Sequence, residues 1–243
     1  MIALNRCCII IPTLNEVGTI EFLITRLREV VPGASILIVD DNSTDGTIEK
    51  VTTLASIDDQ VSLVVRPERL GIGSAHKFGI RSAFTQGFEI AVTMDADLTH
   101  NPDDVPKLLG LLHDYHMVVG SRFLPGGGLQ DWAISRQVLT HVGHLLTKVF
   151  LRVPFDASTG FRAYRLTPTL LDALESSPSS SYGFLVESMG ILTAAKFVVG
   201  EIPVVLPSRT YGHSKMRLRD LAETLAKLVS TKRLISREHL DVR

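Results

Sequence analysis

Cysteine is scarce in this 243-residue sequence, and the only two, Cys7 and Cys8, are adjacent. Neighbouring residues of a strand point to opposite faces, so a disulfide between them would be strained. We therefore expect two free thiols and a reducing compartment. Charge of one sign is also missing: the formal net charge is -1, which argues against a nucleic-acid partner.

No apolar run is long enough to cross a bilayer, and no secretory signal opens the chain. The most apolar long window, residues 183–200, is interrupted by Glu187 and Lys196. We therefore expect a protein that is soluble or lies on a membrane surface, without a spanning segment.

Several common catalytic motifs are absent as well. Gly71-x-Gly73 lacks the third glycine of a dinucleotide fingerprint, and no Walker lysine motif occurs. No Gly-x-Ser-x-Gly segment occurs either, which argues against a serine hydrolase of that type.

What is present is a regular alternation of short β-branched runs and amphipathic stretches. The runs predicted as strands are 7–11, 36–40, 61–66, 90–94 and 117–121. The stretches predicted as helices are 16–31, 44–57, 74–86 and 103–113. This alternation predicts an α/β fold: a mostly parallel, Rossmann-like sheet with helices on both faces.

The second half of the sequence is less regular. We predict a Gly-rich loop at 125–128, helices at 135–152, 168–176 and 184–196, an extended excursion at 156–165 and a strand at 198–206. A last helix is predicted from 217 to about 237. The length suits one catalytic domain, residues 1–215, with a C-terminal basic amphipathic helix, residues 216–243, as part of it.

Paired aspartates follow the predicted strand 90–94. Asp95 and Asp97 are separated by one residue at a strand end, where both carboxylates can reach one hard cation. Mg²⁺ or Mn²⁺ favours such oxygen ligands together with substrate phosphates. A solvated acidic turn is the alternative, but ligands of such sheets bind beyond the carboxyl ends of the strands.

A second acidic segment, residues 40–47, follows another strand. Its adjacent acids, Asp40 and Asp41, can accept hydrogen bonds from a base or a ribose, and Ser43 or Thr44 can cap the next helix. The other interpretation is that these residues only turn the chain and begin the helix, a role that we assign to Asp45 and Gly46.

Cations are spread over the second half of the chain, at Arg122, Arg136, Arg162, Arg209 and Lys215. Arginine suits bidentate phosphate binding and lysine supplies a point charge. We expect Arg122 to point into the crevice at the strand ends, and the segment 209–215 to form a loop over phosphates. Taken singly, each is better explained as a solvated surface charge, and the presence of an acidic metal site weakens that interpretation for the set.

Two histidines, His141 and His144, share one face of a predicted helix, but no third metal ligand is evident. We therefore expect them to serve helix packing or a substrate contact in preference to zinc.

The ordered set of motifs resembles family-two glycosyltransferases of the GT-A fold, and among them the dolichol-phosphate (polyprenol-phosphate) mannose synthases. The motifs run from about residue 9 to residue 215: Pro12-Thr13-Leu14-Asn15-Glu16, Asp40-Asp41-Asn42-Ser43-x-Asp45-Gly46-Thr47, Leu70-Gly71-x-Gly73-x-Ala75, Met94-Asp95-Ala96-Asp97-Leu98, Gly120-Ser121-Arg122, Ser135-Arg136, Thr159-Gly160-Phe161-Arg162-Ala163-Tyr164 and Arg209-x-x-Gly212-x-Ser214-Lys215.

The resemblance implies roles by position. Residues lining the nucleoside pocket would be Pro12, Leu14, Glu16 and Asp41. Asp95 and Asp97 would hold Mg²⁺ or Mn²⁺ against the donor diphosphate, with the backbone of Ala96 nearby. Donor phosphates would be clamped by Arg209 and Lys215, and the acceptor phosphate would be held by Arg122 and Arg136.

Three positions depart from the family pattern. Leu14 stands where tyrosine is frequent, Thr99 where a glutamine can join the metal shell, and Thr140 where a serine often helps to hold the acceptor phosphate. We retain Thr99 as a metal ligand and Thr140 as an acceptor-phosphate residue.

The implied reaction is an inverting transfer of mannose from GDP-mannose to a polyprenyl (dolichyl) phosphate. A lipid phosphate is already an anion near neutral pH, so we predict that no carboxylate acts as catalytic base. Catalysis then rests on charge stabilisation and alignment, and the catalytic residues are predicted to be Asp97, Arg122, Arg209 and Lys215.

A lipid acceptor implies a membrane surface, and the predicted last helix offers one contact. Leucines fall on one face of it, and five Lys and Arg residues between 217 and 233 supply positive charge. We expect a peripheral location on the cytoplasmic face. The same face could instead pack on the core, or dock a membrane-anchoring partner subunit.

Other functions remain open at this point. A polyprenyl-phosphate glucosyl- or aminosugar transferase using a UDP-sugar is the nearest alternative, and Asn42 with Ser214-Lys215 favours mannose by family pattern. A processive polysaccharide synthase lacks support, because spanning helices and a Gln-x-x-Arg-Trp segment are absent. A nucleotidyltransferase would need a glycine-rich basic loop where 12–16 stands, and a non-catalytic binding subunit would not need both aspartates.

Overall fold

The computed structural model describes residues 3–208. The strands are β1 (Cys7–Thr13), β2 (Ser35–Asp40), β3 (Val61–Val65), β4 (Ile90–Thr93), β5 (Met117–Ser121), β6 (Gly128–Gln130), β7 (Arg162–Arg165), β8 (Val199–Pro203) and β9 (Val205–Pro207). The helices are α1 (Ile20–Val30), α2 (Thr47–Ile57), α3 (Ile72–Thr85), α4 (Val105–Leu111), α5 (Ile134–Phe150), α6 (Pro168–Glu175) and α7 (Gly183–Ala194), with short 3-10 turns at Leu4–Arg6 and Pro102–Asp104.

A seven-stranded sheet forms the centre of the molecule, in the order β3-β2-β1-β4-β7-β5-β8. Every neighbouring pair is parallel except the two that involve β7. In β1, Ile9 and Ile11 belong to one hydrophobic cluster, whereas Cys8 and Ile10 belong to the other. Both faces of the sheet are therefore buried, as a parallel sheet requires.

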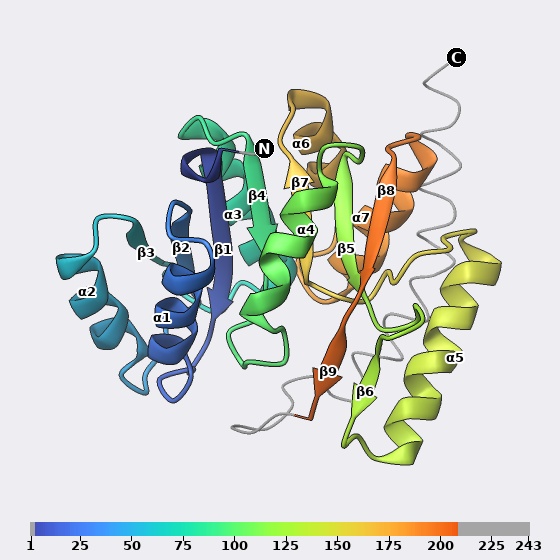
Figure 1. Ribbon diagram of the computed structural model, residues 1–243, viewed down its shortest axis with the longest axis horizontal. Helices are drawn as coiled ribbons and strands as arrows, with labels where there is room; N and C mark the ends of the chain where they lie inside the picture. The colour runs from blue at the N-terminus through green and yellow to red at the C-terminus, as the bar shows by residue number, and fades with distance from the viewer. Residues whose placement is uncertain (1–2, 209–243) are drawn as a thin grey trace.

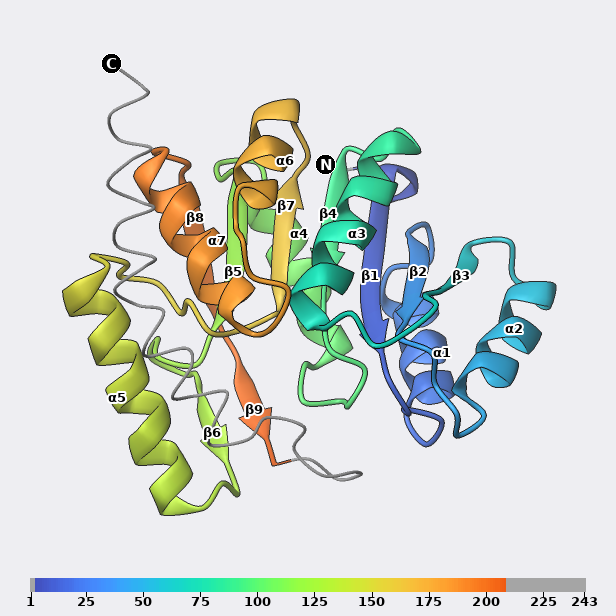
Figure 2. The same ribbon diagram turned by 180° about the vertical axis from the view of Figure 1, so that it is seen from behind.

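Helices cover both faces of this sheet. In Figure 1, α1 and α4 lie in front of the strands, and Figure 2 shows α3, α6 and α7 on the opposite face. The carboxyl ends of β1, β2 and β4 share one edge, because these strands are parallel neighbours or near neighbours in the sheet. The predicted fold class is confirmed.

The segment 156–165 shows how far the sequence interpretation fell short. It was predicted as an extended excursion, but its last four residues form β7, which lies between β4 and β5 and runs antiparallel to both. Arg162 is 0% exposed there. An arginine is not expected in a central strand, because burial of a charged side chain is costly unless its hydrogen-bond donors are satisfied.

The predicted strand 198–206 is in fact two strands. β8 extends the main sheet beside β5, whereas β9 pairs in parallel with β6 to form a separate two-stranded sheet. The chain crosses between the sheets at Val204, whose N–H donates to Ser121 O and whose carbonyl accepts from Gly128 N. Figure 1 shows α5 beside this small sheet, at the end of the molecule farthest from β3.

Arg209, Lys215 and the predicted C-terminal helix, residues 216–243, lie outside the described residues. The single-domain prediction for 1–215 and 216–243 stays a prediction.

Candidate active site

Three loops at the carboxyl edge of the sheet form the site. Each carries one residue in the left-handed region shortly after its strand: Asn15 (φ 56°) after β1, Asn42 (φ 64°) after β2 and Leu98 (φ 62°) after β4. Asparagine tolerates this conformation, whereas it is costly for leucine. The turn that follows Asp95 is therefore strained, a feature that occurs often at functional sites.

The loops after β1 and β2 are joined by hydrogen bonds from side chains. Asp40 is 0% exposed and accepts from Thr13 Oγ1 at 2.6 Å, from Ser43 N at 2.7 Å and from Ser43 Oγ at 2.7 Å. Asn15 N donates to Ser43 Oγ at 2.8 Å, and Thr44 N donates to Asn15 Oδ1 at 2.9 Å. Asp40 is thus used to join two strand ends, which leaves its neighbour Asp41 to face the pocket.

These bonds also correct the predicted helix cap. Neither Ser43 nor Thr44 caps α2, which begins after Gly46, a residue at φ 99°. Asp45 turns the chain instead, since its Oδ1 accepts from Thr47 N at 3.0 Å and from Thr47 Oγ1 at 2.6 Å. The structural role predicted for Asp45 and Gly46 is confirmed.

Asp41, the first residue after β2, forms a buried ion pair with Arg66, which directly follows β3. Arg66 Nη1 also donates to Ser74 Oγ at 2.8 Å, and Gly71 N donates to Asp41 Oδ2 at 3.2 Å. Arg66 therefore fixes the carboxylate of Asp41 to the start of α3, a partner that sequence analysis missed.

The paired aspartates occupy the turn after β4. Asp97 is 5% exposed, and its Oδ1 accepts from Thr99 N at 3.1 Å and from Thr99 Oγ1 at 2.7 Å. The backbone N–H of Asp95 donates to His100 Nδ1 at 2.9 Å, and the ring of His100 stacks on Phe161 with centroids 5.0 Å apart. Thr99, predicted as a metal ligand, directs its hydroxyl to Asp97, so it holds the carboxylate in place.

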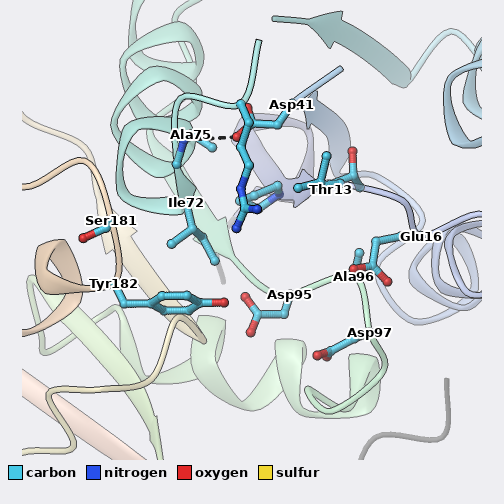
Figure 3. Close-up of a pocket in the computed structure, with 14 residues that line it drawn as sticks. Thr13, Glu16, Asp41, Ile72, Ala75, Asp95, Ala96, Asp97, Ser181 and Tyr182 are labelled. Atoms are coloured by element: carbon cyan, nitrogen blue, oxygen red, sulfur yellow. Dashed lines mark hydrogen bonds between the residues drawn. The ribbon is translucent and has the colours of Figure 1, made fainter. Parts of the chain in front are cut away.

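These loops line one pocket with a cavity volume of about 160 Å³. It contains every described residue predicted for the nucleotide and the metal except Thr99: Pro12, Leu14, Glu16, Asp41, Asp95, Ala96 and Asp97. In Figure 3, the carboxylates of Asp95, Asp97 and Glu16 lie on one side, and the hydroxyl of Tyr182 points toward Asp95 from across the pocket.

The opposite wall was missed. Its lining residues are Arg69, Gly71, Ile72, Ala75, Ser181 and Tyr182. A signal for this wall was present in Gly71-x-Gly73. A Cβ on Gly71 would lie 2.5 Å from Ser180 O, and one on Gly73 would lie 2.5 Å from Phe184 Cβ. Because these two glycines have no side chain, the segment before α7 can pack closely against the start of α3. This packing places Tyr182 at the pocket.

The donor set at Asp95 and Asp97 fits a hard divalent cation. Within residues 3–208, no group of three or more His, Cys, Asp or Glu side chains could hold a metal ion. In phosphate-binding enzymes, Mg²⁺ and Mn²⁺ are typically bound by one or two carboxylates, and their remaining coordination positions are taken by phosphate oxygens and water. The residues therefore fit a metal bound jointly by protein and substrate.

Arg122, predicted for the acceptor phosphate, is engaged by Asp156 on a loop before β7. Its Nε donates to Asp156 Oδ2 at 2.8 Å and its Nη2 donates to Oδ1 at 2.7 Å. Asp156 is 0% exposed. Burial alone raises the pKa of this carboxyl, but the charge and hydrogen bonds of Arg122 together hold the pKa below its usual value.

The other two acceptor-phosphate candidates lie on α5. The guanidinium of Arg136 lies 4.1 Å from the ring centroid of Trp132, and Thr140 Oγ1 donates to Arg136 O at 2.8 Å. Neither residue lines the pocket, and neither does Arg122. Whether these three residues hold a phosphate stays a prediction.

The histidines of α5 pack, as expected. The ring of Phe123 stacks on His144 at 3.9 Å between centroids and meets His141 edge-on at 5.4 Å. Arg162, the remaining predicted cation, donates to three backbone carbonyls and to Ser188 Oγ. It therefore ties β7 to α7.

No helix in the part of the chain that the structure describes is long and apolar enough to span a membrane. Cys7 and Cys8 are both free, as predicted, and both are buried.

Residues 8–169 match the family described as Glycosyl transferase family 2. The chain is 36% identical over 214 residues to an undecaprenyl-phosphate mannosyltransferase of Micrococcus luteus, covering 87% of each protein. It is 32% identical over 231 residues to a dolichol-phosphate mannosyltransferase of Saccharomyces cerevisiae, covering 90% of this chain and 84% of that protein.

The fold is similar to that of mannosyltransferase PcManGT from Pyrobaculum calidifontis, solved in complex with GDP-Man and Mn²⁺. The TM-score is 0.57 at 20% identity, over 96% of this chain and 69% of that one. This match supports the GT-A fold. The chain belongs to glycosyl transferase family 2, and it is a glycosyltransferase.

Proposed function

We propose that this enzyme is a metal-dependent, inverting mannosyltransferase that moves mannose from GDP-mannose to a polyprenyl phosphate. The observation that carries the proposal is the pocket itself: Asp95 and Asp97 face the loops that would bind the nucleoside, in a chain 36% identical to an undecaprenyl-phosphate mannosyltransferase. The alternative donor, a UDP-sugar, would keep the same pocket and mechanism.

The residues that line the pocket would bind either the nucleoside or the metal ion. Pro12, Leu14, Glu16 and Asp41 line the part of the pocket assigned to the nucleoside. Asp95 and Asp97 would hold Mg²⁺ or Mn²⁺, with Thr99 orienting Asp97 through two hydrogen bonds. When bound, the metal neutralises negative charge on the departing diphosphate.

No carboxylate of the chain is assigned as a base. The acceptor is an anion near neutral pH, so the chain must align it and shield charge, without removing a proton. Arg209 and Lys215, outside the described residues, are proposed to hold donor phosphates. The proposed holders of the acceptor phosphate are Arg122, Arg136 and Thr140.

The apolar surface of α5 supports a lipid acceptor. Ile134, Val138, Val142, Leu145 and Val149 recur at helical spacing and are each between 46% and 79% exposed. An exposed apolar stripe on the helix that carries Arg136 suits an interface with lipid. We propose that this face contacts the cytoplasmic surface of a membrane, with the C-terminal segment or a partner subunit as a second contact.

The test is transfer by the full chain in detergent or liposomes. Purified protein is incubated with Mg²⁺ or Mn²⁺, a short polyprenyl phosphate and, in parallel, GDP-mannose, UDP-glucose or UDP-N-acetylglucosamine. The expected product is the mannolipid, formed from GDP-mannose alone, with inversion at the anomeric carbon seen by NMR. Product from a UDP-sugar alone would overturn the donor assignment and keep the fold and metal site.

Asp97→Ala is expected to abolish turnover while the melting temperature stays close to that of the unaltered chain. Asp59→Ala is the matched control, because Asp59 is exposed on the loop before β3. Normal activity of Asp97→Ala would show that the metal assignment is wrong.

A further inference from the structure

The pocket wall opposite Asp95 is reached by a serine-rich segment between α6 and α7. This serine segment, residues 176–181, is serine at every position except Pro178. Ser181 and the following Tyr182 line the pocket, and Figure 3 shows Tyr182 across from Asp95. Serine has no large apolar side chain that could anchor a segment by burial. Hydrogen bonds must therefore hold this part of the wall in place.

A buried carboxylate accepts three of these hydrogen bonds. Glu187 of α7 is 3% exposed. Its Oε2 accepts from Ser177 Oγ at 2.7 Å and from Ser179 N at 3.1 Å, and its Oε1 accepts from Ser179 Oγ at 2.6 Å. Ser177 and Ser179 are themselves buried. Both carboxylate oxygens of Glu187 are thus directed to the serine segment.

The packing of α7 does not account for a glutamate at this position. Every residue from 183 to 192 is buried, a setting that favours apolar side chains. Within residues 3–208, Glu187 forms no ion pair with Lys, Arg or His. The buried guanidinium of Arg162 bonds the adjacent Ser188 and backbone carbonyls instead. Burial of a carboxylate is costly unless it is hydrogen-bonded, so the bonds to the serine segment are what make Glu187 tolerable there.

The serine segment is held on its other side by α3. Ser74 N lies in the first turn of that helix, where backbone N–H groups have no acceptor within the helix, and it donates to Ser180 O at 2.9 Å. Lys77 Nζ donates to Ser177 O at 2.9 Å. These bonds do not involve Glu187. Loss of the carboxylate would therefore loosen one side of the segment and leave the other side attached.

We propose that Glu187 is a positioning residue for the donor pocket. Through Ser177 and Ser179 it fixes the wall that faces the metal-binding aspartates, and this wall contacts the donor beyond its nucleoside, at the diphosphate or the sugar. Glu187 itself does not touch the substrate and transfers no proton. The donor contact rests on the proposed function; the attachment of the serine segment to Glu187 does not.

The position of Tyr182 indicates which part of the donor this wall contacts. In Figure 3, Tyr182 lies across from Asp95 and away from Asp41, the residue assigned to the nucleoside. The metal at Asp95 would bind the diphosphate, so a wall opposite Asp95 borders the diphosphate and the sugar attached to it. A wall that is already fixed spares the ligand the cost of ordering it.

The first test is hydrogen exchange of the Ser179 amide, followed by NMR in the protein without ligand. Glu187→Met keeps the side-chain length but removes the acceptors, and is expected to speed exchange about tenfold. Glu187→Gln is expected to stay within about threefold of the unaltered chain, because its amide oxygen can accept from Ser177 Oγ and Ser179 N while its N–H₂ donates to Ser179 Oγ. Unchanged exchange in Glu187→Met overturns the attachment, and so does exchange as fast in Glu187→Gln as in Glu187→Met.

Ser177→Ala tests the same attachment without altering α7. It removes one of the three hydrogen bonds and is expected to speed exchange of the Ser179 amide about threefold. In a background of Glu187→Met, the same substitution is expected to add nothing, because its partner is already gone. Additive effects contradict a bond between Ser177 and Glu187 as the cause.

The second test compares two ligands by calorimetry in the presence of Mn²⁺. Glu187→Met is expected to weaken binding of GDP-mannose about tenfold and binding of GMP by less than about twofold, because only the former reaches the loosened wall. Equal losses for both ligands, or unchanged affinity for GDP-mannose, overturn the donor contact. In the transfer assay, Glu187→Gln is expected to keep kcat within about threefold; a loss of about a hundredfold would assign proton transfer to the carboxylate and contradict the positioning role.

Ser180→Ala is the matched control on the same segment. The side chain of Ser180 is exposed, and the variant keeps the carbonyl that accepts from Ser74 N. Exchange of the Ser179 amide and affinity for GDP-mannose are both expected to stay unchanged. If the unaltered chain bound neither GMP nor GDP-mannose, the proposed donor would be wrong, and hydrogen exchange would still decide whether Glu187 holds the serine segment.

Discussion

Replacing Asp156 with asparagine should destabilise the protein far more than its loop position suggests. Asp156 is 0% exposed, and the side chain of Arg122 is 8% exposed. The carboxylate accepts from Arg122 Nε at 2.8 Å, from Nη2 at 2.7 Å and from the backbone N–H at 3.2 Å. An asparagine side chain at this position would keep the shape of the aspartate but would place an amide N–H₂ against a guanidinium donor.

The expected loss is about 3 kcal/mol, because one charge-assisted hydrogen bond is removed and a buried guanidinium is left without its counter-charge. For a chain of this size, that corresponds to a melting temperature lower by about 6–12 °C. The assay is thermal unfolding followed by circular dichroism at pH 7.5. Asp59→Asn, on an exposed loop, is the matched control.

The pH dependence follows from the lowered pKa of Asp156. Its contribution to stability is complete above about pH 5, where the carboxyl is ionised in both folded and unfolded states, and is lost as pH falls through the folded-state pKa. The deficit of Asp156→Asn should therefore be constant from pH 8 to about pH 5 and shrink in more acidic solution.

A double-mutant cycle with Arg122→Met measures how much of the lost stability comes from the pairing of Arg122 with Asp156. Once Arg122 is gone, Asp156→Asn should cost at least 1 kcal/mol less than it costs alone. Equal costs in the two backgrounds, or a melting temperature of Asp156→Asn within about 1 °C of the unaltered chain, would contradict the pairing as the source of stability.

Three further outcomes are expected. Gly73→Ala should destabilise the fold by about 1–3 kcal/mol in urea unfolding, because its methyl group meets backbone and side-chain atoms at 2.5–2.6 Å, whereas Gly110→Ala should not. Thr99→Val should weaken Mn²⁺ binding about tenfold, because the 2.7 Å hydrogen bond to Asp97 is lost; unchanged affinity would contradict that role. Iodoacetamide should not modify Cys8 in the native protein at pH 8, as judged by mass spectrometry, because burial raises the pKa of its thiol to about 12.

The first half of the fold could be predicted from local pattern alone. Strands buried on both faces appear in sequence as short continuous apolar runs, and the five predicted runs match β1 to β5 within two residues at each end. Helix starts were less accurate. The helix predicted from residue 16 begins at Ile20. The N–H of Glu16 donates to Oγ1 of Thr47, the first residue of α2, a contact between distant segments that local pattern does not show.

The nucleotide and metal wall of the pocket was equally accessible to sequence. Residues that directly follow parallel strands meet at one edge, so the motifs after β1, β2 and β4 had to converge. The partners of these residues were not accessible. Nothing local connects Asp41 to Arg66, or Arg122 to Asp156 across 34 residues.

Sequence by itself therefore determined the strands β1 to β5, the edge that carries the chemistry and the acidic pair that follows β4, because each depends on short-range periodicity and strand order. Tertiary structure decided the rest. It placed β7 in the middle of the sheet, antiparallel to β4 and β5. It also packed the segment before α7 closely against Gly71 and Gly73, so that Tyr182 lines the pocket. Each depends on contacts between segments distant in the chain, and packing, not propensity, selects such contacts.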